Sequence, residues 1–358
     1  MATLLTPGPV PVPIWVQEAM QQPVMHHRTP EFEDFFQSCL SDLQYVFQTE
    51  GAVAVSLGSG TFGVEMAMYS LFQPGDTVAV LDMGKFSGRW ADYASVLGCA
   101  VIRLQKQWGE TWMADELIEQ LATYPAPKGI VITHSETSTG TIVDLETLAA
   151  QLRVTYPDML IVVDAITSVG AMPYYHDAWE IDCTITASQK ALMNPAGLAL
   201  FAVSARGRQA MRNRDAGDFQ HVENYLQLAE KNSFPFTAPV IPLYGLAAVL
   251  AHIRSQTLPV IWQSCHQSAQ TFRRGLKNIG GSLFSQYPTD SLTAFQVQGI
   301  QMTQLGHMLK QSYGWELSGG QGLLKGKILR ISHMAEADDQ IMEKVLEDLQ
   351  LSHGRLRG

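Results

Sequence analysis

Basic residues are scarce in this sequence. Lysine and arginine together number 24 against 34 aspartates and glutamates, which gives the 358 residues a net charge of −10. No stretch gathers the positive charge that binding to a phosphate backbone requires. The composition therefore argues against nucleic acid as a partner.

Long apolar runs are absent as well. None approaches the roughly 20 residues that a membrane-spanning helix needs. The first residues also lack the basic segment and apolar core of a signal peptide. We therefore expect a cytoplasmic protein with no membrane partner.

Cysteine is rare and dispersed. The four cysteines are Cys39, Cys99, Cys183 and Cys265, and no two of them form a CxxC pair. This spacing favours free thiols in a reducing compartment over disulfides or metal ligands. We expect no metal site.

The length of the chain predicts more than one core. With 358 residues, 46% of them hydrophobic and 16% charged, the chain suits one large domain and a smaller one. Residues 1–14 are too rich in proline for a helix and predict an extended arm on the surface. We expect the large domain to span 15–255 and a small C-terminal α+β domain to span 256–358. We expect the tail of the chain, 352–358, to fray.

Residues 50–205 alternate between short β-branched runs and helical stretches. The predicted strands are 52–57, 77–81, 100–104, 129–133, 160–163, 183–186 and 197–203. Alternation of this kind predicts an α/β fold, with a mostly parallel sheet sandwiched by helices.

Chemically useful side chains follow the ends of these strands: Ser59, Phe86, Thr137, Asp164 and Lys190. In open α/β sheets, ligands bind at the edge formed by the carboxyl ends of the strands. The carboxylate of Asp164 and the amine of Lys190 suit a cofactor that needs a covalent amine and an acid to hold a proton. Pyridoxal phosphate is such a cofactor.

Three local motifs each allow two interpretations. Residues 58–61, Gly-Ser-Gly-Thr, lie between a strand and a helix and can cradle a phosphate or simply cap the helix. Phe86 can stack on a planar ring from a loop, which its flanking glycines and charges favour, or belong to the core. The cluster His26-His27-Arg28 is favoured as a polar loop before the next helix.

Several motifs in order resemble one family. They are TPGPVPVP at 6–13, HHR at 26–28, GSGT at 58–61, GKFSGRW at 84–90, HSETSTG at 134–140, VDAITSVG at 163–170, ASQKALMNPAG at 187–197 and GGQGLLKGKILRISH at 319–333. The chain is similar to the class V aminotransferases, which are fold-type I pyridoxal-phosphate enzymes. The likeness is greatest to the alanine–glyoxylate and serine–pyruvate group and to a related aspartate aminotransferase group.

The resemblance implies a role for each matching residue. Lys190 should form the Schiff base with the cofactor, and Asp164 should keep its pyridine nitrogen protonated. Arg330 should bind the substrate α-carboxylate. The other implied cofactor contacts are Ser59, Gly60, Thr61 and Gln189 at the phosphate, Phe86 and Ile166 on the two ring faces, Thr137 at the ring hydroxyl, and Thr237 at the phosphate of a neighbouring subunit.

The implied reaction is transamination in a homodimer. The donor would be alanine, serine or aspartate, and the acceptor glyoxylate, pyruvate or 2-oxoglutarate. Two departures from the family concern the pocket: Phe86 stands where some relatives carry tryptophan, and His26-His27-Arg28 differs from the alanine–glyoxylate branch. His27 and Arg28 could provide a basic pocket for a second substrate carboxylate.

Two alternatives remain open. The same fold carries lyases such as cysteine desulfurases, which need a reactive cysteine on a mobile loop, and none of the four cysteines lies in such a loop. The other alternative is a non-catalytic subunit, which the presence of Lys190, Asp164 and Arg330 disfavours.

Overall fold

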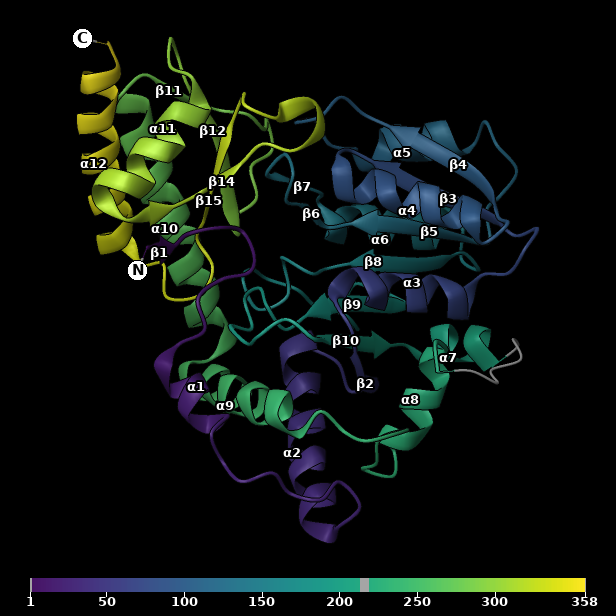
Figure 1. Ribbon diagram of the computed structural model, residues 1–358. Helices are drawn as coiled ribbons and strands as arrows, with labels where there is room; N and C mark the ends of the chain where they lie inside the picture. Colours follow the sequence, from purple (N-terminus) through teal and green to yellow (C-terminus); the bar gives the residue numbers. More distant parts are fainter. Residues whose placement is uncertain (1, 213–218, 358) are drawn as a thin grey trace.

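The computed structural model describes residues 2–212 and 219–357, and within them the largest sheet has seven strands (Figure 1). Their order is β2-β10-β9-β8-β5-β3-β4. β10 is antiparallel to both its neighbours, while the pairs from β9 to β4 are parallel. The strands are β2 (Ala52–Leu57), β3 (Thr77–Asp82), β4 (Ala100–Gln105), β5 (Gly129–Thr133), β8 (Leu160–Asp164), β9 (Cys183–Ala187) and β10 (Leu198–Val203).

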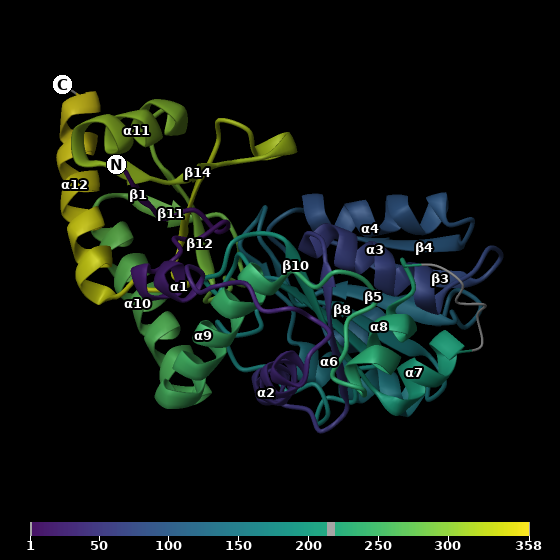
Figure 2. The same ribbon diagram turned by 60° about the horizontal axis from the view of Figure 1, so that its bottom comes forward.

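Helices cover both faces of this sheet, as predicted. Figure 2 shows α3 (Gly60–Leu71) and α4 (Lys85–Val96) on one face and α6 (Leu145–Thr155) on the other. α5 (Ala114–Leu121) packs against α6. The chain moves across the sheet in one direction from β3 to β4 and in the opposite direction from β4 to β5. Because parallel crossovers are right-handed, this reversal puts α4 and α5 on opposite faces. Each predicted strand agrees with the structure to within one residue at either end.

Five further helices surround the β2 end of the sheet: α1 (Ile14–Ala19), α2 (Pro30–Phe47), α7 (Ala205–Arg212), α8 (Val222–Ala229) and α9 (Val240–Gln256). α2 shows how its sequence determines a helix. The hydroxyl of Thr29 accepts a hydrogen bond from the N–H of Phe32, and Pro30 occupies the first turn. Phe32, Phe36 and Leu43 recur at helical spacing and are buried.

A second, antiparallel sheet contains β11 (Gly281–Leu283), β12 (Leu292–Val297), β15 (Leu329–Ser332) and β14 (Ser318–Gly319), in that order. Around it lie α10 (Leu258–Asn278), α11 (Met302–Met308), the π-helical turn η1 (Leu309–Tyr313), the 3-10 turn η2 (Gly322–Leu324) and α12 (Asp339–Arg357). Phe272, Phe295 and Ile331 belong to a core of their own. Leu258 and Trp262 of α10 pack in the core of the large sheet, so α10 contributes to both cores. The domain boundary at 255/256 stays a prediction.

The N-terminal arm is extended, but it is more deeply embedded than an arm lying on a surface. β1 (Thr3–Leu4) pairs in parallel with β13 (Trp315–Glu316). The carbonyl of Leu5 accepts a hydrogen bond from Ser332 at 2.9 Å, and Val10 N–H donates to the Gln189 carbonyl at 3.1 Å. The side chains of Leu5 and Val10 are both only 3% exposed. The arm therefore bridges the small sheet and the Lys190 loop.

Two local predictions are wrong. Phe86 does not lie in a loop, because α4 already begins at Lys85. The tail 352–358 was expected to fray, yet α12 continues to Arg357 and Ser352 is fully buried, with its hydroxyl bonded to the Asp348 carbonyl at 2.8 Å. Among the described residues, no helix combines the length and apolar character needed to cross a membrane.

Candidate active site

A buried cavity of about 120 Å³ lies at the carboxyl ends of β5, β8 and β9. Nine of the residues predicted for the site line it together with four others. The full lining is Ser59, Gly60, Thr61, Phe86, Trp90, Thr133, Ser135, Thr137, Asp164, Ile166, Thr167, Gln189 and Lys190. The expectation that residues after separate strand ends meet in one place is therefore correct.

Asp164 ends β8, and its carboxylate accepts two hydrogen bonds. The main-chain N–H of Ile166 donates to Oδ1 at 3.1 Å, and the indole Nε1–H of Trp90 donates to Oδ2 at 2.9 Å. Burial raises the pKa of Asp164 to about 6, against the opposing effect of these two donors. The group is thus ionised at neutral pH but close enough to its pKa to share a proton with a basic ring nitrogen.

Lys190 follows β9 and projects into the same cavity. Its Nζ donates to the main-chain carbonyl of Pro7, in the N-terminal arm, at 2.8 Å. Burial and then the positive charge of Arg330 lower the pKa of Lys190 to about 8, while Asp164 opposes this change. More of this amine is therefore neutral and nucleophilic near neutral pH than in an ordinary lysine.

The Gly-Ser-Gly-Thr motif caps a helix, and Ser59, Gly60 and Thr61 also line the cavity. Ser59 caps α3, since its Oγ accepts from Phe62 N–H at 3.3 Å. Gly60 and Thr61 start the helix, whose positive N-terminal end faces the cavity and suits a phosphate. The guanidinium of Arg89 donates to Thr61 Oγ1 at 3.1 Å and adds a positive charge at this end.

Phe86 and Ile166, predicted to cover the two faces of the cofactor ring, both line the cavity. Phe86 occupies the first turn of α4, where its N–H and that of Ser87 donate to the buried carboxylate of Glu136 at 3.1 and 2.8 Å. Arg89 lies over the Phe86 ring, with its Cζ 5.3 Å from the centroid. The position of Phe86 is thus set by Glu136, which lies on the strand β6 (Ser135–Glu136), far from Phe86 in the sequence.

The cavity fits a flat ring that carries a phosphate. Gln189 Oε1 and Thr133 Oγ1 are buried beside it and have no hydrogen-bond partner in the described part of the chain. Orphaned polar atoms of this kind indicate a missing polar ligand. A Cβ on Gly60 would lie 2.6 Å from Ile166 Cδ1, so glycine is needed to keep this wall close-packed.

Arg330, on β15, is buried near the cavity without lining it. Its guanidinium donates to the Thr137 carbonyl at 2.8 Å and to the Gly319 carbonyl at 2.8 and 3.2 Å. Burial lowers the pKa of Arg330 to about 10, so it stays cationic at neutral pH. The positive charge that lowers the pKa of Lys190 comes from this side chain.

A family model describes most of the chain: residues 17–338 match the model for aminotransferase class-V. The chain belongs to the class-V aminotransferase family. It is a pyridoxal-phosphate-dependent aminotransferase with the fold-type I architecture.

Three similar proteins place this aminotransferase among its relatives. The small subunit of a soluble hydrogenase from a Synechococcus species is 31% identical, over 95% of this chain and 89% of that protein. L-aspartate–glyoxylate aminotransferase from Paracoccus denitrificans is 29% identical, over 97% and 92%. The crystal structure of alanine–glyoxylate aminotransferase from a Nostoc species is 28% identical, covers 98% of this chain and 95% of that chain, and superposes with a TM-score of 0.92.

Besides Arg330, three residues predicted for the site of this aminotransferase do not line its cavity in the single chain. Thr237 is exposed, between α8 and α9. Arg28 is exposed too and donates to Ser233 Oγ at 2.9 Å, while His27 packs edge-on against Phe32. Arg28 thus contacts the segment between α8 and α9 that also carries Thr237.

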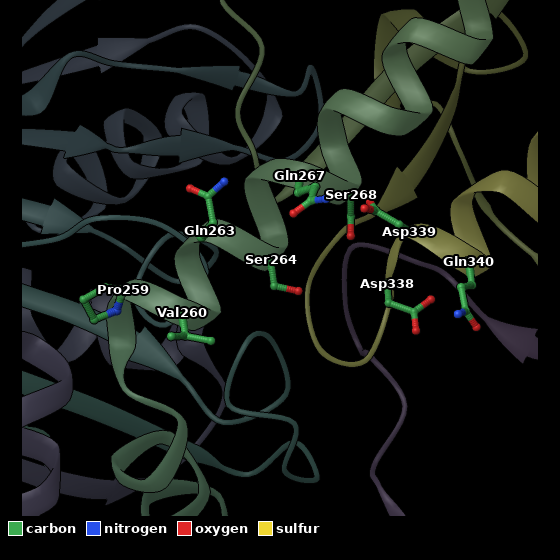
Figure 3. A pocket seen from close by; sticks show the side chains of 9 residues that line it. All are labelled: Pro259, Val260, Gln263, Ser264, Gln267, Ser268, Asp338, Asp339 and Gln340. Carbon is green, nitrogen blue, oxygen red and sulfur yellow. The ribbon is translucent and has the colours of Figure 1, made fainter.

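A wider hollow elsewhere on the aminotransferase does not have the chemistry of the cofactor. It encloses about 580 Å³ between α10 and the start of α12, and Figure 3 shows its nine side chains. Its charged side chains, Asp338 and Asp339, are acidic. An acidic hollow repels a phosphate, so the smaller cavity at Lys190 is the better candidate site.

Sequence reasoning missed Trp90, Thr133, Ser135 and Thr167 in the lining of this aminotransferase site. Thr133 and Ser135 flank the end of β5, so strand-end position could have identified them. Trp90 resembles an ordinary core residue. Once a helix is assigned from Lys85, however, Trp90 lies four residues after Phe86 and therefore on the same face.

Proposed function

We propose that this aminotransferase moves the amino group of a small amino acid to a small 2-oxo acid, with Lys190 and Asp164 as its central residues. The donor is alanine, serine or aspartate, and the acceptor is glyoxylate, pyruvate or 2-oxoglutarate. The observation that carries the proposal is one buried cavity that holds both the carboxylate of Asp164 and an amine, on Lys190, whose pKa is lowered to about 8.

Pyridoxal phosphate, when bound, supplies the ring that makes the substrate Cα proton acidic. The neutral amine of Lys190 would take that proton from Cα and deliver it to the C4′ carbon of the cofactor, which the lowered pKa supports. Asp164 would keep the ring nitrogen protonated, and Phe86 and Ile166 would cover the ring. Ser59, Gly60, Thr61 and Gln189 would hold the phosphate, and Thr137 would hold the ring hydroxyl.

Arg330 is proposed to bind the α-carboxylate of each substrate. A guanidinium has five N–H donors, and three hydrogen bonds to carbonyls leave two donors for a carboxylate. Glyoxylate appears in the names of both the Paracoccus and the Nostoc enzymes, which supports it as the acceptor. The carboxylate of aspartate is the donor group that His27 and Arg28 would recognise.

We further propose a homodimer in which Thr237, His27 and Arg28 of one subunit complete the site of the other. Their position outside the cavity of their own chain supports this assignment. Mixing an inactive Lys190→Ala protein with a Thr237→Asp protein tests it, because one site of the mixed dimer then has both native residues. Recovery of activity is expected. No recovery after verified subunit exchange would contradict the shared site.

A desulfurase is the weaker alternative. Cys39, Cys183 and Cys265 are buried, and burial raises the pKa of each thiol, so none is a ready nucleophile. Cys99 is partly exposed but does not line the cavity. A non-catalytic role as a subunit is the second alternative, which the name of the Synechococcus relative supports.

The decisive experiment is a panel of alanine, serine and aspartate against glyoxylate, pyruvate and 2-oxoglutarate, with the product amino acid identified by chromatography. Cysteine is included, with sulfide as its readout. Transfer from a small donor supports the proposal. Sulfide release without transfer supports the lyase, and a protein that neither binds pyridoxal phosphate nor turns over any pair supports the subunit. The cytoplasmic location stays a prediction that cell fractionation can test.

A further inference from the structure

Helix α4 presents two aromatic side chains to the cofactor cavity. Phe86 and Trp90 are four residues apart and both line the cavity. Trp90 is only 1% exposed, and its indole nitrogen lies 2.9 Å from Asp164 Oδ2. An indole N–H can donate but cannot accept, so this contact consistently favours the ionised carboxylate.

The other groups around Asp164 act on its ionisation in opposite directions. Ile166 N–H occupies Oδ1 at 3.1 Å, and the amine of Lys190 adds a positive charge from the loop after β9. Burial and the carboxylate of Glu136, on β6 (Ser135–Glu136), act against ionisation. Two neutral neighbours complete the set: the hydroxyl of Tyr174, which bonds Thr184 at 2.6 Å, and the buried ring of His134, which packs on Tyr174.

Trp90 is the side-chain hydrogen-bond donor to Asp164 in this arrangement, while the other donor is main chain and cannot be changed by substitution. Each carboxylate oxygen keeps one acceptor position after these two bonds. The bond also fixes the carboxylate plane, since Trp90 is locked by packing. The remaining lone pairs are therefore oriented before any ring nitrogen arrives.

We propose that Trp90 is a positioning residue that keeps Asp164 ionised and oriented, and so sets the lower pH limit at which this aminotransferase binds its cofactor. The inference rests on the proposed role of Asp164 as the partner of the ring nitrogen. Loss of the donor favours the protonated acid. A protonated Asp164 and a protonated ring nitrogen cannot pair, so binding then weakens at a higher pH.

The test is equilibrium binding of 4′-deoxypyridoxine 5′-phosphate to the apoenzyme between pH 5 and 9. This probe keeps the ring nitrogen and the phosphate but has no aldehyde, so Lys190 cannot react with it. In Trp90→Phe, we expect the midpoint of the acid-side loss of affinity to rise by about one pH unit, as loss of one hydrogen bond to a charged group implies. Trp112→Phe is the matched control, because Trp112 is also buried but donates to the Leu104 carbonyl.

Two more variants separate hydrogen bonding from packing. Trp90→Met also lacks the donor and must show the same rise, which covers the case in which Trp90→Phe does not fold. Trp90→His keeps a ring N–H and should return the midpoint toward the wild-type value. A midpoint in Trp90→Phe or Trp90→Met equal to that of Trp112→Phe would overturn the inference.

Asp164→Asn distinguishes failure of the inference from failure of the proposed function. If Asp164→Asn leaves the binding profile unchanged, Asp164 is not the partner of the ring nitrogen, and the roles proposed for Asp164 and Trp90 are both wrong. If Asp164→Asn removes the loss of affinity on the acid side while Trp90→Phe does not shift it, only the role proposed for Trp90 is wrong. In the double variant, Trp90→Phe should no longer shift any midpoint.

Discussion

Glu136 and Phe86 are joined by a hydrogen bond of 3.1 Å between a buried carboxylate and a main-chain N–H. The same carboxylate oxygen accepts from the N–H and hydroxyl of Ser87 at 2.8 and 2.9 Å, and the other oxygen accepts from Ser138 N–H and Oγ at 3.0 and 2.6 Å. A residue 50 positions later in the chain thus caps α4 and holds the Phe86 side of the cavity against the loop that carries Thr137.

Glu136→Gln should therefore weaken the hydrogen bonds that hold the first turn of α4, with Phe86, to the loop that carries Thr137. The amide nitrogen of glutamine would face N–H and O–H donors that lose their acceptor, which should lower the free energy of unfolding by about 2 kcal/mol. Affinity for pyridoxal phosphate should fall as well. Urea denaturation of the apoenzyme and cofactor titration measure the two effects. Glu146→Gln, an exposed change in α6, serves as control, and equal stability of the two variants would contradict the capping role.

Lys190→Ala should abolish transamination and remove the visible absorbance of cofactor bound through the lysine. The reason is that no other amine lines the described cavity. Spectra and product assays check this prediction, with Lys85→Ala as control because Lys85 is exposed at the start of α4. Wild-type turnover in Lys190→Ala would refute the assignment of the catalytic lysine.

Cofactor uptake by the apoenzyme should depend on pH through Lys190. The folded-state pKa, about 8, lies below the usual lysine value, so the reactive neutral amine accumulates as pH rises from about 7 to 9. The second-order rate of reaction with pyridoxal phosphate should rise over that range and level off above it, after correction for the titration of the aldehyde reagent itself. Stopped-flow absorbance measures this rate. A rise that continues through pH 10 would show an unperturbed lysine.

Arg330→Lys should raise the KM for amino donors by about 10- to 100-fold, since lysine keeps the charge but loses the two parallel N–H donors. Cofactor affinity should change little, because Arg330 does not line the cofactor cavity. Steady-state kinetics with several donors test whether KM changes without a change in cofactor affinity, and substitution of the exposed Arg274 of α10, Arg274→Lys, controls for general effects. An unchanged KM would transfer the carboxylate-binding role to Arg28 or Arg89.

Strand positions and the meeting of Asp164 with Lys190 could be predicted from sequence because both depend on local patterns. Short β-branched runs identify buried strands, and parallel strands bring their carboxyl ends to one edge. Phe86 was misplaced because its helix depends on a distant carboxylate, Glu136, that no window around residue 86 contains. The bond between Trp90 and Asp164 was missed for the same reason: the partners are 74 residues apart.

The places of Thr237, His27 and Arg28 could not be predicted from periodicity, since they depend on what covers an exposed surface. The embedding of the N-terminal arm is also non-local. Its proline content predicts an extended conformation, but the partner strand is chosen by residues 315 and 316. The end of α12 depends on tertiary packing in the same way. The composition of this segment predicts fraying, but the burial of Ser352 shows that packing orders it.

The arm has a consequence for how the protein is made. Thr3 pairs with Trp315, so the arm finds its partner strand in a part of the chain that is made much later. The large sheet, whose strands all precede residue 204, can form during synthesis, but the arm cannot dock until β13 has emerged. The newly made chain should therefore be unable to retain pyridoxal phosphate tightly until β13 has been made.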